Sequence, residues 1–142
     1  MDDQALSGIV KRVSRWPFTE TLEAIIAAIV HGKMVIFARI DHAASARGIG
    51  ISIPEATVLI YGNPRAGTTA LIDAPFAALE LPLRVLLQEE GGRVVVAFHP
   101  VTAMLMHSGV SKAVAEKLEP GQRLLLDALE AMTIRERPLK PI

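Results

Sequence analysis

The sequence predicts an α+β fold, with a mainly antiparallel sheet of about four to five strands backed by helices and a helical C-terminal extension. The apolar residues switch between continuous β-rich runs and a helical spacing along the chain. Two β-rich runs flank Glu89–Gly92, which is a strong hairpin signal. With 142 residues, 51% of them hydrophobic, the chain is long and apolar enough to bury the core of one domain.

The first part of the chain has the pattern strand, helix, strand. Valines among basic residues at 9–15 are typical of a short half-buried strand. A helix should follow from Thr19, capped by Thr19 or Thr21 and ended by a left-handed Gly32. The continuous β-rich run 34–40 then predicts a strand covered on both faces. The helix takes its apolar stripe from residues at helical spacing, namely Leu22, Ile25, Ile26, Ile29 and Val30.

The middle of the chain should return to the sheet through short helices. Asp41 is placed to cap a short helix that runs through Ala46, and 57–62 reads as another buried strand. Turn residues at Asn63-Pro64 should lead to a short helix that starts at Thr68 or Thr69 and ends at Ile72. Pro75, at a favoured first helical position, predicts a helical turn to Leu79.

The second half should form a hairpin and then helices only. Residues 82–88 and 93–98 are expected to be antiparallel neighbours. We expect residues 1–134 to form a single domain and 135–142 to be a frayed tail. Glycine and proline separate three predicted helices after Pro100: Val101–Met106, Lys112–Leu118 and Gln122–Met132.

The composition excludes several classes of function. Fifteen basic residues balance fifteen acidic ones, so no net charge attracts nucleic acid or an anionic membrane. The absence of cysteine excludes disulfides, thiol nucleophiles and thiolate metal sites. The longest apolar stretch, 24–30, is too short to span a bilayer, and the acidic start lacks the features of a signal peptide. We therefore expect a cytoplasmic protein.

Three motifs carry a family resemblance. Asp41-His42 stands at a strand end, the run 53–64 closes on Gly-Asn-Pro, and 81–84 is Leu-Pro-Leu-Arg. In this order they resemble domain-of-unknown-function family 302, over roughly 21–107. The resemblance implies a small α+β domain with an antiparallel sheet backed by helices, commonly a homodimer, and no established reaction. The chain departs from the family in its longer helical ending and in His99, where a small polar residue is expected.

Polar residues concentrate at two predicted strand ends, and this predicts a small-molecule pocket. His42 could orient or protonate a ligand, or act as a general acid or base with help from Asp41. Arg65 could neutralise an acidic group on the ligand. The remaining predicted ligand-binding residues are Tyr61, Asn63, Thr68 and His99.

Several alternatives remain open at this point. Asp41 could simply cap a helix, and the loop after Tyr61 could be an ordinary turn. His42, His99 and His107 could together ligate a metal, or one of them haem iron, although their spacing matches no known motif. The function predicted first is therefore small-molecule binding, with an enzyme using His42, a metal or haem protein, and a structural dimerisation module as the alternatives.

Overall fold

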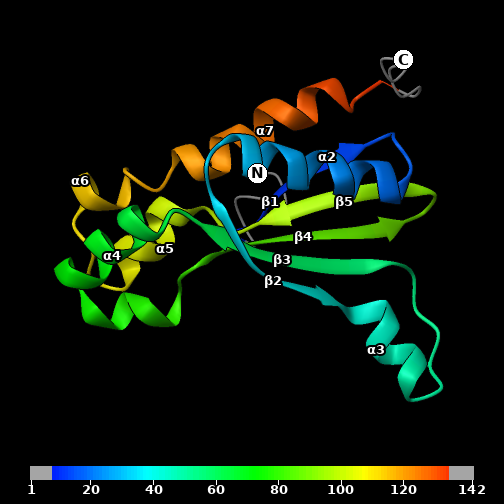
Figure 1. Ribbon diagram of the computed structural model, residues 1–142, viewed down its shortest axis with the longest axis horizontal. Helices are drawn as coiled ribbons and strands as arrows, with labels where there is room; N and C mark the ends of the chain where they lie inside the picture. The colour runs from blue at the N-terminus through cyan, green and yellow to red at the C-terminus, as the bar shows by residue number, and fades with distance from the viewer. Residues whose placement is uncertain (1–7, 135–142) are drawn as a thin grey trace.

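A five-stranded antiparallel sheet organises the molecule (Figure 1). The computed structural model describes residues 8–134, and the predicted frayed tail, 135–142, lies outside this range. The order of the strands is β1-β5-β4-β3-β2, and every neighbouring pair is antiparallel. The predicted α+β class and the predicted hairpin are confirmed. The strands are β1 Val10–Ser14, β2 Val35–Asp41, β3 Ala56–Gly62, β4 Leu83–Glu90 and β5 Arg93–Phe98.

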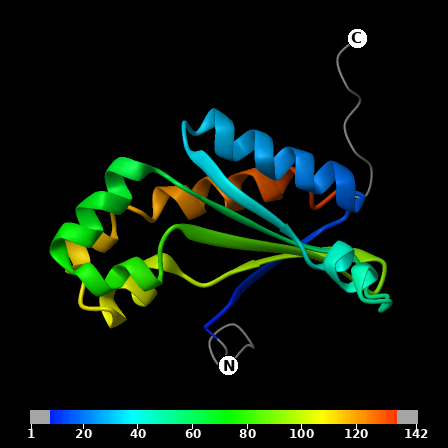
Figure 2. The ribbon, with the colours of Figure 1, turned by 60° about the horizontal axis from the view of Figure 1, so that its bottom comes forward.

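Two long helices cover one face of the sheet. Helices α2, Phe18–His31, and α7, Pro120–Ala131, lie side by side on that face (Figures 1 and 2). The short helices gather at the two ends of the strands. Helix α3 lies at one end, whereas α4, η1, α5 and α6 lie at the other (Figure 1). These short elements are α3 His42–Gly48, α4 Pro64–Asp73, the 3-10 helix η1 Pro75–Leu79, α5 Val101–His107 and α6 Lys112–Ala115.

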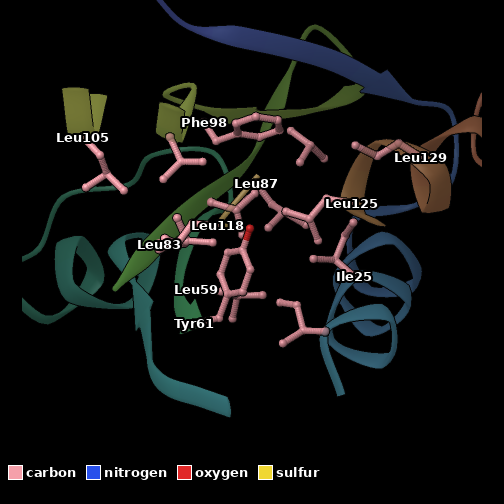
Figure 3. Packing of buried hydrophobic residues seen from close by; sticks show 14 of the residues in the cluster. Ile25, Leu59, Tyr61, Leu83, Leu87, Phe98, Leu105, Leu118, Leu125 and Leu129 are labelled. Atoms are coloured by element: carbon pink, nitrogen blue, oxygen red, sulfur yellow. The ribbon is translucent and has the colours of Figure 1, made fainter. Parts of the chain in front are cut away.

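The core lies between the sheet and the two long helices. Alternate residues of each central strand point to this side, because successive side chains of a strand face opposite ways. Tyr61 lies in the middle of the cluster (Figure 3). The same cluster includes Leu59, Leu83 and Leu87 from the sheet, Ile25 from α2, and Leu125 and Leu129 from α7.

The other face of the sheet is also apolar. A cross-strand row joins Ile40, Val58, Leu86 and Ala97, and we call the face that carries this row the open sheet face. Both long helices pack on the opposite side (Figure 2). Val58, Leu86 and Ala97 are half-buried and Ile40 is exposed.

Three local predictions are wrong for identifiable reasons. The run 34–40 was expected to be covered on both faces, but β2 is an edge strand, and Phe37 at its bulge is 51% exposed. Helix α2 starts before Thr19 and has no side-chain cap, because the Thr21 hydroxyl is buried against the Ser14 hydroxyl at 2.7 Å. Gly32 is not left-handed, since Lys33 takes the positive φ of 60° instead.

Two other helix boundaries differ from the prediction. The helix expected to begin at Thr68 or Thr69 begins four or five residues earlier, at Pro64, because Asn63 caps it. The helix expected over Lys112–Leu118 is regular only to Ala115. The earlier start of α4 brings its first turn directly against the end of β3.

Candidate functional site

The strand directions separate the two halves of the predicted site. In the pairing of β2 with β3, Asp41 lies opposite Thr57, and Val35 lies opposite Gly62. Asp41 and His42 are therefore at one end of the sheet and the Tyr61–Arg65 segment is at the other. The seven residues of β3 place these ends roughly 20 Å apart, at about 3.3 Å per residue. The expectation of one pocket shared by both segments is corrected, because the end of a strand lies beside the start of its antiparallel neighbour.

The Asp41 end of the sheet shows a capped helix. Oδ1 of Asp41 accepts a hydrogen bond from the backbone N–H of Ala44 at 2.8 Å. His42 is the exposed first residue of α3. This carboxylate already serves as the N-cap, and the structure gives no hydrogen bond between it and the imidazole of His42.

The histidines are also separated from one another. His99 follows β5 at the end of the sheet opposite His42, and its Nδ1 lies 3.4 Å from the carbonyl oxygen of Gly8. His107 is the exposed last residue of α5. Within residues 8–134, no group of three or more histidine, aspartate or glutamate side chains could hold a metal ion. The idea that these histidines converge on His42 is therefore corrected.

A cavity of about 380 Å³ opens at the Tyr61 end of the sheet; we call it the end cavity. It lies between the ends of β2, β3 and β4, the helix α4, η1 and the chain that leads into α7. Its walls are mostly apolar, and Lys117 is the one charged residue among the described residues that line it. The lining residues include Met34, Phe37, Asn63, Gly67, Thr68, Leu71, Leu81, Lys117, Gly121 and Leu124.

Local sequence features shape this cavity. Oδ1 of Asn63 accepts hydrogen bonds from the N–H groups of Arg65 at 2.9 Å and Ala66 at 3.4 Å, so α4 starts at the strand end. Gly67 faces free space, because a Cβ there would meet nothing within 4 Å. Gly121 allows a close approach, since a Cβ there would lie 3.0 Å from Cδ1 of Leu83. The glycines thus leave room that larger residues would fill.

Tyr61 is fully buried in the core next to this end of the sheet. Its hydroxyl donates a hydrogen bond to the carbonyl oxygen of Gly121 at 3.0 Å. Burial raises the pKa of Tyr61 far above its ordinary value. Tyr61 therefore positions the start of α7, and it does not line the cavity as the sequence led us to expect.

Gln122 fixes the same segment from the other side and was missed in the sequence. Its Nε2 donates to the carbonyl oxygen of His99 at 2.7 Å, and its Oε1 accepts from the N–H of Val101 at 2.9 Å. The sequence does contain a pattern that could have revealed Gln122. This residue shares the helical spacing of Leu125 and Leu129, so it is a polar residue on the buried face of the helix.

The structure divides the predicted ligand-binding residues into two groups. Asn63 and Thr68 line the end cavity, whereas Tyr61, Arg65 and His99 do not. Lys117 was missed, because no sequence pattern linked the α6–α7 region to the strand ends. Together, the lining offers an apolar space with a cation and two polar side chains at its wall.

Comparison with known proteins identifies relatives. The chain matches the family model described as domain of unknown function DUF302 over residues 9–132. It is 37% identical over 114 residues to the fluoride-specific ion channel FluC 1 of Brucella suis biovar 1 (strain 1330). The same identity is found with FluC 1 of Brucella abortus biovar 1 (strain 9-941). These matches cover 78% of this chain but only 45% and 42% of the two relatives.

A solved structure shares the fold. A crystal structure of an uncharacterised conserved DUF302 protein from Bacillus stearothermophilus superposes with a TM-score of 0.75 at 14% identity. The superposition covers 86% of this chain and 95% of that one.

Among residues 8–134, no helix has both the length and the apolar character needed to cross a bilayer. The family model covers most of the chain, and the chain therefore belongs to the domain-of-unknown-function family 302.

Proposed function

We propose that this chain is a cytoplasmic small-molecule-binding domain and that its ligand occupies the end cavity. The observation that supports this proposal is a space of about 380 Å³ with mostly apolar walls. Ligand pockets in proteins have volumes of roughly 300–1,000 Å³ and combine apolar walls with a few polar groups. At roughly 30 Å³ for each water-sized group, the end cavity has room for a ligand of about ten to twelve non-hydrogen atoms.

The test uses 1-octanol as a neutral ligand of about this size. Thermal unfolding of the wild type should shift upward as octanol saturates the native state. With roughly 0.6 kcal/mol per non-hydrogen atom, the dissociation constant should be on the order of 0.1 mM or lower. A rise in melting temperature that saturates with octanol concentration is the expected result.

A variant that fills the end cavity makes this test specific. Gly67→Leu adds a side chain where the glycine faces free space, so it should remove the octanol effect and leave the domain folded. Gly48→Leu is the matched control, since Gly48 in α3 also faces free space but lies at the other end of the sheet. No saturable effect in the wild type, or an undiminished effect in Gly67→Leu, would overturn the proposal.

The Brucella relatives support a second candidate function. Less than half of each relative aligns with this chain, so in those proteins the matching region is one part of a polypeptide named as a fluoride channel. We infer that this chain acts beside a fluoride-specific channel as an accessory domain. Deleting its gene should lower the growth of its host in fluoride medium, and growth should recover when the chain is supplied again. Unchanged fluoride tolerance would refute this candidate.

We further propose that the chain pairs with a second copy through the open sheet face and through residues 49–53 after α3, which we call the arm. This arm carries three exposed isoleucines, Ile49, Ile51 and Ile53, and exposed apolar groups of this kind often mark protein interfaces. Ile51→Asp should lower the molar mass measured by sedimentation from that of a dimer to that of a monomer. Ile72→Asp, at an even more exposed isoleucine in α4, should leave the mass unchanged. A monomeric wild type would contradict this assembly.

A further inference from the structure

We propose that the natural ligand of the end cavity is an amphiphilic monocarboxylate of about eight to ten carbons, with its carboxylate at Lys117. This inference rests on the proposed function and names the chemical class of its ligand. Three properties of the cavity support it: the sign of its charge, the kind of polar groups at its wall, and the nature of the remaining surface.

The charge of the cavity comes from Lys117. The lining contains no aspartate or glutamate among the described residues. The nearby carboxylates are paired elsewhere, because Glu116 pairs with Lys112 at 3.8 Å and Glu119 pairs with Arg123 at 2.7 Å. None of the four ion pairs found within residues 8–134 includes Lys117. The ammonium group is thus available to an anion from the ligand, and an amine-bearing ligand would be repelled.

The polar side chains of the lining favour the same kind of ligand. Oδ1 of Asn63 is occupied as the cap of α4, so its NH₂ group is the part that remains to bind a ligand. The structure gives the hydroxyl of Thr68 no hydrogen-bond partner within the described chain, whereas that of Thr69 donates to the carbonyl of Arg65 at 3.0 Å. An amide N–H and a hydroxyl can donate to carboxylate oxygens, and such charge-assisted bonds are stronger than neutral ones.

The rest of the lining suits a hydrocarbon chain. Met34, Leu71, Leu81 and Leu124 offer flexible aliphatic surface from four separate segments of the chain. No aromatic stacking pair is available, because Phe37 is the single aromatic residue among the described lining residues. An aliphatic chain of eight to ten carbons has about the volume that the cavity provides, which favours it over a nucleotide or an aromatic cofactor.

Calorimetric titration of the wild type with octanoate, 1-octanol and octylamine tests the inference. Octanoate should bind at least about tenfold more tightly than octanol, which is the contribution of one charge-assisted hydrogen bond. Octylamine should bind most weakly. Since Lys117 is exposed, the preference for octanoate should shrink as salt is added.

Variants identify the source of this preference. Lys117→Met should abolish the preference for octanoate and leave octanol binding unchanged, whereas Arg93→Met, which removes a positive charge at the hairpin on the opposite end of the sheet, should keep it. Asn63→Asp retains the capping oxygen but adds a negative charge, so it should weaken octanoate specifically.

The possible outcomes separate this inference from the proposed function. Equal affinity of the wild type for octanol and octanoate, or an unchanged preference in Lys117→Met, would overturn the inference. The proposal that the end cavity binds a small molecule would still hold. If no compound binds to the wild type, the inference and the proposed function both fall. The predicted preference in the wild type and its loss in Lys117→Met would support both.

Discussion

Replacing Gln122 with leucine should destabilise the whole domain, because two buried hydrogen bonds depend on this side chain. Gln122 is only 6% exposed, and Val101 is completely buried. Leucine is of similar size but cannot bond to the N–H of Val101 or the carbonyl of His99. An unpaired buried polar group costs about 1–3 kcal/mol, and water can reach part of the exposed His99. We expect the free energy of unfolding to fall by about 2–4 kcal/mol from a total of about 5–15 kcal/mol.

Urea unfolding measures this loss directly. The chain has one tryptophan, Trp16, whose fluorescence follows unfolding of the region between β1 and α2. The midpoint should fall with an unchanged slope, which indicates a change in stability rather than in the unfolded state. Arg123→Ala is the neighbouring control, since it removes an exposed ion pair with Glu119 and should change the midpoint little. A loss below about 1 kcal/mol for Gln122→Leu would refute the reasoning.

Two further outcomes follow from the same geometry. Asp41→Ala removes the cap of α3 and should lower the free energy of unfolding, measured in urea, by about 1 kcal/mol. Octanol binding at the other end of the sheet should stay the same. Weakened binding would contradict the separation of the two ends. Burial raises the pKa of Tyr61, so the folded state keeps this proton where the unfolded state loses it, and the free energy of unfolding should fall as the pH rises above about 10. Tyr61 is the one tyrosine of the chain, so tyrosinate absorbance should appear only as the protein unfolds, and an earlier appearance would be inconsistent with its burial.

Most of the fold could be predicted from the sequence, because the residue patterns that specify its helices and turns are local. The Gly91-Gly92 pair takes positive φ values of 59° and 79°, as a tight hairpin turn requires. Asp41 caps α3 as expected, and Leu22, Ile25 and Ile29 of the predicted stripe of α2 are buried in the core, whereas Val30 at the end of that stripe is 58% exposed. In contrast, no local pattern reveals that β2 is an edge strand, because its position depends on the pairing of the whole sheet.

The candidate site was harder to predict, because it depends on contacts between distant segments. Of the predicted ligand-binding residues, Asn63 directly follows β3 and Thr68 lies in α4, and both line the end cavity. The sequence wrongly joined Asp41 and His42 to them, since a strand end gives no information about which end of the sheet it occupies. Lys117 comes from a segment about fifty residues further along the chain. Only the packed chain shows that this lysine lines the cavity.

The most direct test of the central claim is to locate a bound neutral ligand by nuclear magnetic resonance. Methyl-labelled protein saturated with 1-octanol should show intermolecular contacts between the octyl chain and the methyl groups of Leu71, Leu81 and Leu124. The methyl groups of Ile40 and Ile53 serve as internal controls away from the end cavity. Contacts confined to the three leucines would confirm the account, whereas contacts with the isoleucines alone, or none at saturation, would contradict it.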